Sequence, residues 1–266
     1  MSQVTYRQDL KALLNYAQIL PNHINILQEI ANCYADMNRY QKAIPYGQKI
    51  ESLTPNDINN LLFLGNAYYH VDQFAEALKY FLKVESRQSL PPEYLSYVGY
   101  CFQTQNDYTK AVQYHLKAYH HLPKNLWNLG HIGYSFQALE DFDQALEYYK
   151  IAEKINPQEE IVLMNIGWIY LIKGKIKEAE NYLVKAYQLD NYDAYTLMNL
   201  GHICLIQGDN SKAFDFYRRS ILEFPSSEEF KKLFEEDQHY LSIYNISVKT
   251  FEFIKNEMLE YAQKAR

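Results

Sequence analysis

Residues 126–159 read LWNLGHIGYSFQALEDFDQALEYYKIAEKINPQE, and this stretch decides the fold. Two sets of its residues each have the spacing of one helix face: Leu129, Ile132, Gly133 and Phe136 in the first half, and Ala145, Tyr149 and Ala152 in the second. The polar turn Glu140-Asp141 separates them, and Pro157 ends the second helix because proline has no N–H to continue it. The stretch therefore predicts a pair of helices joined by a turn.

The same pattern recurs every 34 residues, without insertions, in six units that begin at residues 24, 58, 92, 126, 160 and 194. The position of Gly133 is small in every unit, at Ala31, Gly65, Gly99, Gly167 and Gly201. The position of Ala145 is always alanine, at Ala43, Ala77, Ala111, Ala179 and Ala213. Small residues let helices approach closely in a packed interior. One pair cannot bury its own apolar face, so we expect the pairs to stack into a solenoid.

The pattern resembles the tetratricopeptide repeat (TPR) across residues 24–227. The resemblance implies an all-α fold, a right-handed superhelical solenoid of helix-turn-helix repeats. We expect six full repeats, over 24–57, 58–91, 92–125, 126–159, 160–193 and 194–227. An N-terminal capping helix (1–23) and C-terminal capping helices (228–266) flank them. Alternatively, the N-terminal helix is the second half of a repeat, left over from a longer ancestral array.

Three local features modify this scheme. Pro45 lies inside the second helix of the first unit and Gly47 takes the position of Tyr149, so we expect a kink or fraying near 45–47. Glu235 occupies a position that should be small, which predicts that the array ends there. A last helix over 248–264 is expected to cover the final repeat or, alternatively, to pair with a second copy of the chain as a homodimer.

Composition narrows the function. The chain has 266 residues, a net charge of −6 and no lysine- or arginine-rich run, which argues against nucleic acid as a partner. The N-terminus MSQVTYRQDL has no apolar core of an export signal, and no run of 18 apolar residues exists, so we expect a cytoplasmic protein without a membrane span. Cys33, Cys101 and Cys204 are in no metal-binding spacing and are interpreted as buried thiols.

One face of the first helices is not explained by packing. Positions 2, 5, 6 and 9 of each unit lie about 200° round the helix from the packed positions, toward the inner wall that this family forms. None of these 24 positions is Lys or Arg. The best-known peptide-binding mode of the family is a carboxylate clamp, in which basic residues at these positions hold the C-terminal acid of a chaperone tail. That mode is therefore disfavoured here.

Aromatic and amide side chains occupy this face instead. The candidate partner-binding residues are Phe63, Asn66, Tyr97, Tyr100, Trp127, His131, Tyr134, Asn165, Trp168, Tyr195, Asn199 and His202. Aromatic rings offer stiff contact area and amides can hydrogen-bond an extended backbone. Gly130 leaves a gap between Trp127 and Tyr134 into which a partner side chain could enter. The hypothesis is a concave aromatic groove that binds an extended or helical protein segment with apolar anchors. The alternative is that these aromatic residues pack between neighbouring repeats.

Catalytic signatures are missing. The phosphate-binding, nucleophile-elbow and zinc-protease motifs do not occur, and we expect no catalytic residues, no metal and no cofactor. Gly130 and Gly133 form no phosphate loop, because they lie within a helix and the repeat explains both. His120-His121 is interpreted as a solvated turn. The favoured function is a protein-interaction scaffold or adaptor. The alternatives are a chaperone or regulatory module whose superhelix changes shape on peptide binding, and an accessory subunit of an enzyme.

Overall fold

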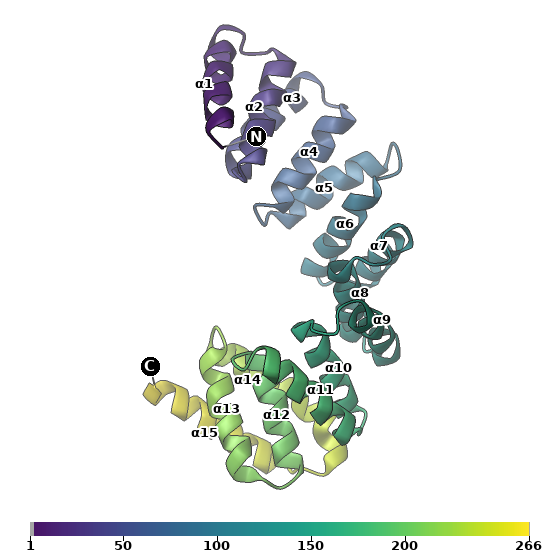
Figure 1. Cartoon of the computed structure of the whole chain (residues 1–266), viewed down its shortest axis with the longest axis vertical. Coiled ribbons are helices and arrows are strands. Elements are labelled where there is room, and N and C mark those ends of the chain that lie inside the picture. Colours follow the sequence, from purple (N-terminus) through teal and green to yellow (C-terminus); the bar gives the residue numbers. More distant parts are fainter. Residues whose placement is uncertain (1–2, 266) are drawn as a thin grey trace. The chain divides into compact units, whose positions relative to one another are not determined.

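The structure is a computed structural model that describes the backbone of residues 3–265 and the side chains of residues 10–265 (Figure 1). All regular elements in the described range are helical. They are α1 (Gln3–Ile19), α2 (Ile24–Asp36), α3 (Tyr40–Leu53), α4 (Ile58–Tyr69), α5 (Phe74–Glu85), α6 (Pro92–Thr104), α7 (Tyr108–His121), α8 (Leu126–Ala138), α9 (Phe142–Ile155), α10 (Glu160–Ile172), α11 (Ile176–Leu189), α12 (Ala194–Ile206), α13 (Asn210–Glu223), α14 (Ser227–Tyr240), the 3-10 helix η1 (Leu241–Tyr244) and α15 (Val248–Ala265). The predicted all-α class is confirmed.

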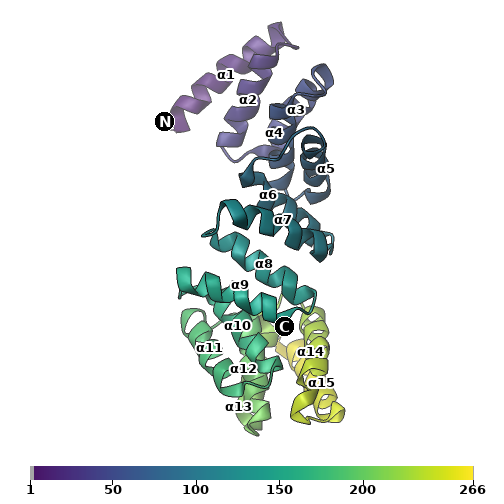
Figure 2. The ribbon, with the colours of Figure 1, turned by 90° about the vertical axis from the view of Figure 1, so that its right-hand side faces the viewer.

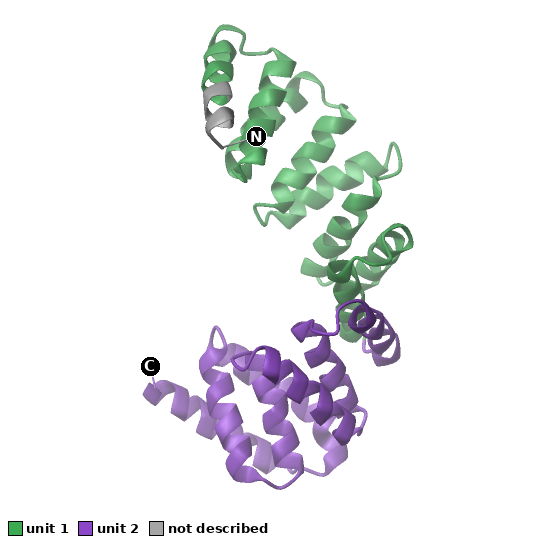
Figure 3. Ribbon diagram, viewed as in Figure 1, with its two compact units in different colours: residues 1–139 green, residues 140–266 purple. Residues whose placement is uncertain are grey.

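The chain divides into two compact units, residues 1–139 and residues 140–266 (Figure 3). The division falls between α8 and α9, inside the repeat expected at 126–159. We call these unit 1 and unit 2 and describe each by itself.

The turns that join paired helices share one backbone conformation. A residue in the left-handed region recurs every 34 positions, at Asn38, Asp72, Asn106, Glu140, Gly174 and Gly208, with φ between 54° and 82°. After it, the next N–H bonds back to a carbonyl five residues earlier, as from Gln73 to Tyr68 at 3.0 Å. This is the hydrogen bond that closes a Schellman helix end. Asn, Asp and Gly tolerate this conformation best, so Glu140 is the unusual residue of the series.

In the pairs α4–α5, α6–α7, α10–α11 and α12–α13, the small residue of the first helix accommodates one large side chain of the second helix, sixteen residues later. A Cβ built at Gly65 would lie 2.7 Å from the ring of Phe81, and one at Gly201 would lie 2.5 Å from the ring of Tyr217. The small residues therefore allow the close approach that was expected. The group that approaches the backbone of the first helix is a side chain of the second helix and not its backbone. The first pair differs, because Ala31 stands in the first helix and Gly47 in the second.

Unit 1 stacks these pairs in sequence, α2 with α3, α4 with α5 and α6 with α7, and α8 packs on α7. A core that runs from Ile44 to Ala118 links the pairs α4–α5 and α6–α7. Pro45 lies inside α3, which nevertheless continues to Leu53, so the expected fraying at 45–47 does not occur. Where Gly47 leaves room, side chains of the next pair, Leu64 and Phe63, approach to 2.8 and 3.2 Å of a Cβ built there.

Unit 2 pairs α10 with α11 and α12 with α13, and then closes with a cap (Figure 2). Ser226 accepts a hydrogen bond from the Glu229 N–H at 3.1 Å and so caps the start of α14. The last helix, α15, packs against α13 and α14 with Phe251, Ile254 and Met258 buried. In this structure the last helix thus lies against α13, the second helix of the final repeat. Glu235 forms an ion pair with Lys255 of α15 at 2.7 Å.

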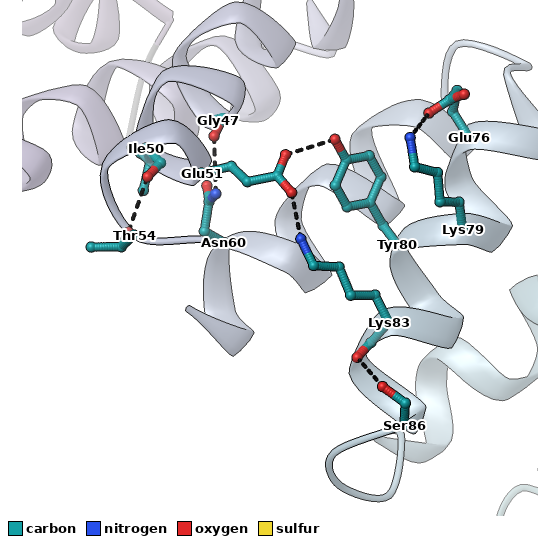
Figure 4. Close-up of polar contacts among 10 residues, drawn as sticks. All are labelled: Gly47, Ile50, Glu51, Thr54, Asn60, Glu76, Lys79, Tyr80, Lys83 and Ser86. Atoms are coloured by element: carbon teal, nitrogen blue, oxygen red, sulfur yellow. Dashed lines mark hydrogen bonds and ion pairs between the residues drawn. The ribbon is translucent and has the colours of Figure 1, made fainter. Parts of the chain in front are cut away.

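A polar contact between successive second helices joins a glutamate of one repeat to a tyrosine and a lysine of the next (Figure 4). Glu51 of α3 accepts hydrogen bonds from the Tyr80 hydroxyl at 2.8 Å and from the Lys83 ammonium at 2.6 Å, both of α5. One repeat later, Glu85 contacts the Tyr114 hydroxyl and lies 3.5 Å from the Lys117 ammonium. We call this arrangement the Glu-Tyr-Lys latch. It joins neighbouring repeats on the side of the second helices.

Two further expectations concern the cysteines and membrane-spanning helices. Cys33 and Cys101 are buried as predicted, whereas Cys204 is half-buried, and the three are in no disulfide. None of the helices in the described part of the chain is both long enough and apolar enough to span a bilayer.

Candidate functional site

The candidate residues of unit 1 lie on three successive first helices. Phe63 and Asn66 are on α4, Tyr97 and Tyr100 on α6, and Trp127, His131 and Tyr134 on α8. We call these seven residues the aromatic face. Each helix brings its residues to one side because they are spaced by three or four positions.

The rings of this face form a connected series. Tyr69, at the end of α4, stacks on Tyr97 with centroids 4.3 Å apart. Tyr97 lies 6.4 Å from Trp127, and Tyr100 lies 5.7 Å from Trp127. These rings therefore pack against neighbouring helices, as the alternative of packing between repeats expects.

Packing does not cover the face completely. Trp127 remains 40% exposed and Tyr134 45% exposed, which is a large accessible area for two aromatic side chains. Trp127 also contacts the imidazole of His131, with ring centroids 4.2 Å apart. Exposed aromatic residues held in place by neighbours are typical of the anchor residues in protein interfaces.

Gly130 lies one turn beyond Trp127 on α8. A Cβ built there would meet no atom within 4 Å, whereas a Cβ at Gly99 would lie 2.8 Å from the His115 ring. A glycine inside a helix costs up to about 1 kcal/mol relative to alanine. The expectation that the repeat explains Gly130 is therefore wrong, because packing requires Gly99 but does not require Gly130. The predicted gap beside Trp127 is present.

The histidines next to Trp127 are uncharged at neutral pH. Burial lowers the pKa of His131 to about 4, and its Nδ1 lies 2.8 Å from the Gln103 side-chain oxygen. Behind it, His115 is fully buried and its Nδ1 lies 2.8 Å from the Asn128 side-chain oxygen. Burial lowers the pKa of His115 to about 3, against a smaller raising effect of that hydrogen bond. The aromatic face consequently carries no positive charge from these two rings.

The candidate residues of unit 2 are arranged differently. Asn165, Asn199 and His202 are buried, with 8%, 2% and 0% of their surface exposed. The expectation that they line an open wall is wrong in this structure. Buried rings of the C-terminal cap surround His202, because Phe234 and Phe251 lie 5.4 and 6.2 Å from its imidazole. Tyr195 remains 37% exposed, and its hydroxyl donates to Glu229 at 3.1 Å.

Asp237 of α14 makes polar contacts between the C-terminal cap and these side chains. The Trp168 indole N–H donates to Asp237 at 3.0 Å, and His202 Nε2 lies 3.2 Å from the other carboxylate oxygen. A carboxylate can only accept, so His202 Nε2 donates to it, and His202 Nδ1 lies 2.9 Å from the Tyr217 hydroxyl. Two of the predicted binding residues of unit 2 are thus used to hold the chain's own α14. Sequence reasoning missed Asp237, although an acidic residue on the apolar side of α14 was the available signal.

Comparison with known proteins identifies the repeat. One family model described as "Tetratricopeptide repeat" matches residues 63–125 and 132–195, and a second with the same description matches residues 24–57 and 194–226. Together they cover well over half of the chain. The chain belongs to the tetratricopeptide repeat family. The repeat is a protein-interaction scaffold and is generally non-enzymatic.

Solved structures share the fold. The crystal structure of YrrB, described as a TPR protein with an unusual peptide-binding site, has a TM-score of 0.62 and 17% identity over 71% of this chain and 97% of that one. A crystal structure of MamA has a TM-score of 0.56 and 21% identity, over 61% and 95%. MamA from Desulfovibrio magneticus RS-1 has a TM-score of 0.58 and 17% identity, over 63% and 95%. No curated protein matches the sequence.

No group of three or more His, Cys, Asp or Glu side chains among those described is placed to hold a metal ion.

Proposed function

We propose that this TPR protein is a scaffold or adaptor that binds a segment of another protein on the aromatic face of unit 1. The observation that carries the proposal is the pair Trp127 and Gly130. An indole that is 40% exposed stands beside a glycine that packing does not require. A cost of up to about 1 kcal/mol in helix stability is explained if the space is used by a ligand.

The surrounding side chains support the same function. Tyr97 and Tyr100 contact the Trp127 ring and hold it in place, which lowers the entropy lost when a partner binds. Asn66 supplies an amide that can hydrogen-bond a peptide backbone. The binding surface proposed here is confined to unit 1, because Asn165, Asn199 and His202 of unit 2 are buried.

The test is affinity purification from the native cell with three baits: wild type, Trp127→Ala and Phe253→Ala. Phe253 is a matched control, since it is an aromatic residue of α15 that is 59% exposed and belongs to unit 2. We expect one protein to be recovered with wild type and with Phe253→Ala but not with Trp127→Ala. Circular dichroism of all three baits shows whether the fold is retained.

The affinity of that protein can then be measured directly. Removal of a central aromatic anchor is expected to weaken binding about 10- to 100-fold. If every partner is retained by Trp127→Ala, the aromatic face is not the binding site. Loss with Phe253→Ala alone would place the interface on α15 instead, where a second copy of the chain is the alternative that sedimentation would detect.

A further inference from the structure

In unit 1, lysine ammonium groups lie over tyrosine rings of the second helices and over Phe102 of α6. In unit 1 the Lys117 ammonium lies 4.4 Å from the centre of the Tyr114 ring, and the Lys79 ammonium lies 5.7 Å from that of Tyr80. Both rings belong to second helices, α7 and α5. Lysine positioned over a ring is stabilised by the negative charge of the ring face.

The rings of the aromatic face have no such partner. Among the described residues, no lysine or arginine lies over Tyr97, Tyr100 or Trp127. The tetratricopeptide positions that point to this side contain no Lys or Arg in any repeat. The two histidines near Trp127 are neutral, as described above. The exposed part of the Trp127 ring is therefore available to a cation from outside the chain, whereas one face of Tyr97 is covered by the stacked Tyr69 ring.

A carboxylate completes the surface. Glu93 precedes Tyr97 by four residues and Tyr100 by seven, which places all three on the same side of α6. Glu93 is exposed and makes no ion pair within the described part of the chain. The neighbouring helix α8 contributes Trp127, whose ring contacts both tyrosines. An unpaired carboxylate and an exposed indole thus occur together, with no positive charge between them.

We propose that the protein segment bound by the aromatic face carries an arginine or lysine, whose charged group lies over Trp127 and pairs with Glu93. This inference rests on the proposed function and specifies the chemistry of the ligand. It is the opposite of a basic clamp for a carboxylate, and it agrees with the net charge of −6. Gly130 leaves room beside Trp127 for the methylene groups of such a side chain, which pack well against apolar surface.

The experiment starts with a displayed library of random 12-residue peptides. Peptides are selected on the wild-type chain and then depleted on Trp127→Ala, so that only binders of the aromatic face remain. Selected peptides are synthesised with their native Arg or Lys and, as neutral isosteres, with citrulline or acetyl-lysine. Their affinities are measured by fluorescence anisotropy on the wild type, Trp127→Leu and Glu93→Gln.

Neutralising one cation of the peptide is expected to weaken binding to the wild type about 10-fold. The same neutralisation should have much less effect on Trp127→Leu, which keeps an apolar side chain but has no ring. Glu93→Gln should weaken binding of the cationic peptide about threefold and reduce its dependence on salt. Glu76→Gln is the matched control, because Glu76 is an exposed carboxylate of α5 that is already paired with Lys79, and it should change nothing.

The outcomes separate this inference from the function on which it rests. Peptides that depend on Trp127 but lack basic residues, or that bind equally well after neutralisation, overturn the cation and leave the binding face intact. A selection that yields no Trp127-dependent peptide overturns both.

Discussion

Replacing Gly130 with alanine should stabilise the protein and weaken its binding. The added methyl group meets no atom within 4 Å, so it introduces no clash. Alanine is favoured over glycine inside a helix by about 1 kcal/mol, and we expect most of this difference to appear as an increased free energy of unfolding of unit 1. The same methyl group fills the space beside Trp127, so the affinity for a peptide selected on the aromatic face should fall severalfold. A substitution that raises stability and lowers affinity marks a residue kept for function.

Gly99→Ala provides the matched control on the preceding first helix. There the new Cβ would lie 2.8 Å from the fully buried His115 ring, and overpacking of this kind costs about 1–3 kcal/mol. Even after the gain in helix propensity, the net change is a loss of up to about 2 kcal/mol. The two glycines should therefore shift stability in opposite directions.

The measurement is urea denaturation followed by circular dichroism. Because repeat arrays and chains of two units do not have to unfold in one step, midpoints are compared instead of extrapolated free energies. An increase of about 1 kcal/mol corresponds to a midpoint roughly 0.5 M higher for Gly130→Ala. A lower midpoint for Gly130→Ala, or a higher one for Gly99→Ala, would show that the packing described around these residues is wrong.

Three further predictions concern stability. Burial lowers the pKa of His115 in the folded chain to about 3, below its value in the unfolded chain, so protonation favours unfolding. Stability should therefore fall as the pH is lowered from about 6.5, and the slope should be smaller in His115→Leu. A pH titration of the urea midpoint measures this. Glu51→Gln should lower stability by about 1 kcal/mol, because it weakens two hydrogen bonds of the latch. Glu76→Gln alters an exposed surface ion pair and should change stability by less than about 0.5 kcal/mol. Equal urea midpoints for the two variants would contradict the role of the latch. Asp237→Ala leaves the N–H groups of the Trp168 indole and the His202 imidazole without their acceptor and should destabilise unit 2 by about 1–3 kcal/mol. Asp237→Asn should destabilise it less. Hydrogen exchange in α14 is the readout, and unchanged exchange would count against these hydrogen bonds.

Much of the fold could be predicted because the packed positions recur at a fixed interval. The small residues at Gly65, Gly99 and Gly201 and the alanines of the second helices identify the helix pairs, and the described helices follow them. The latch was equally periodic, since Glu51 and Glu85 are one repeat apart, as are Tyr80 and Tyr114. It could have been found by applying the same 34-residue shift to the polar residues.

The site was less predictable, for a physical reason. Helical spacing places residues such as Trp127 and His202 on the same side of their helices but does not say what covers that side. The segment that covers His202 is α14, which follows the last repeat, and the array itself carries no information about its path. Asp237, on a side of α14 shared with Phe230 and Phe234, was the one residue that signalled a polar partner within the fold.

The latch also bears on how such a chain can lengthen. The segment 58–91 contains both halves of the latch. Tyr80 and Lys83 donate hydrogen bonds to the glutamate of the preceding repeat, and Glu85 accepts one from the tyrosine of the following repeat. A tandem duplication of this segment would present Glu85 of the first copy to Tyr80 and Lys83 of the second, and Glu85 of the second copy to Tyr114. Each new junction would be complete at the moment of duplication, without a compensating mutation. Arrays of this kind can thus gain whole repeats in a single genetic event.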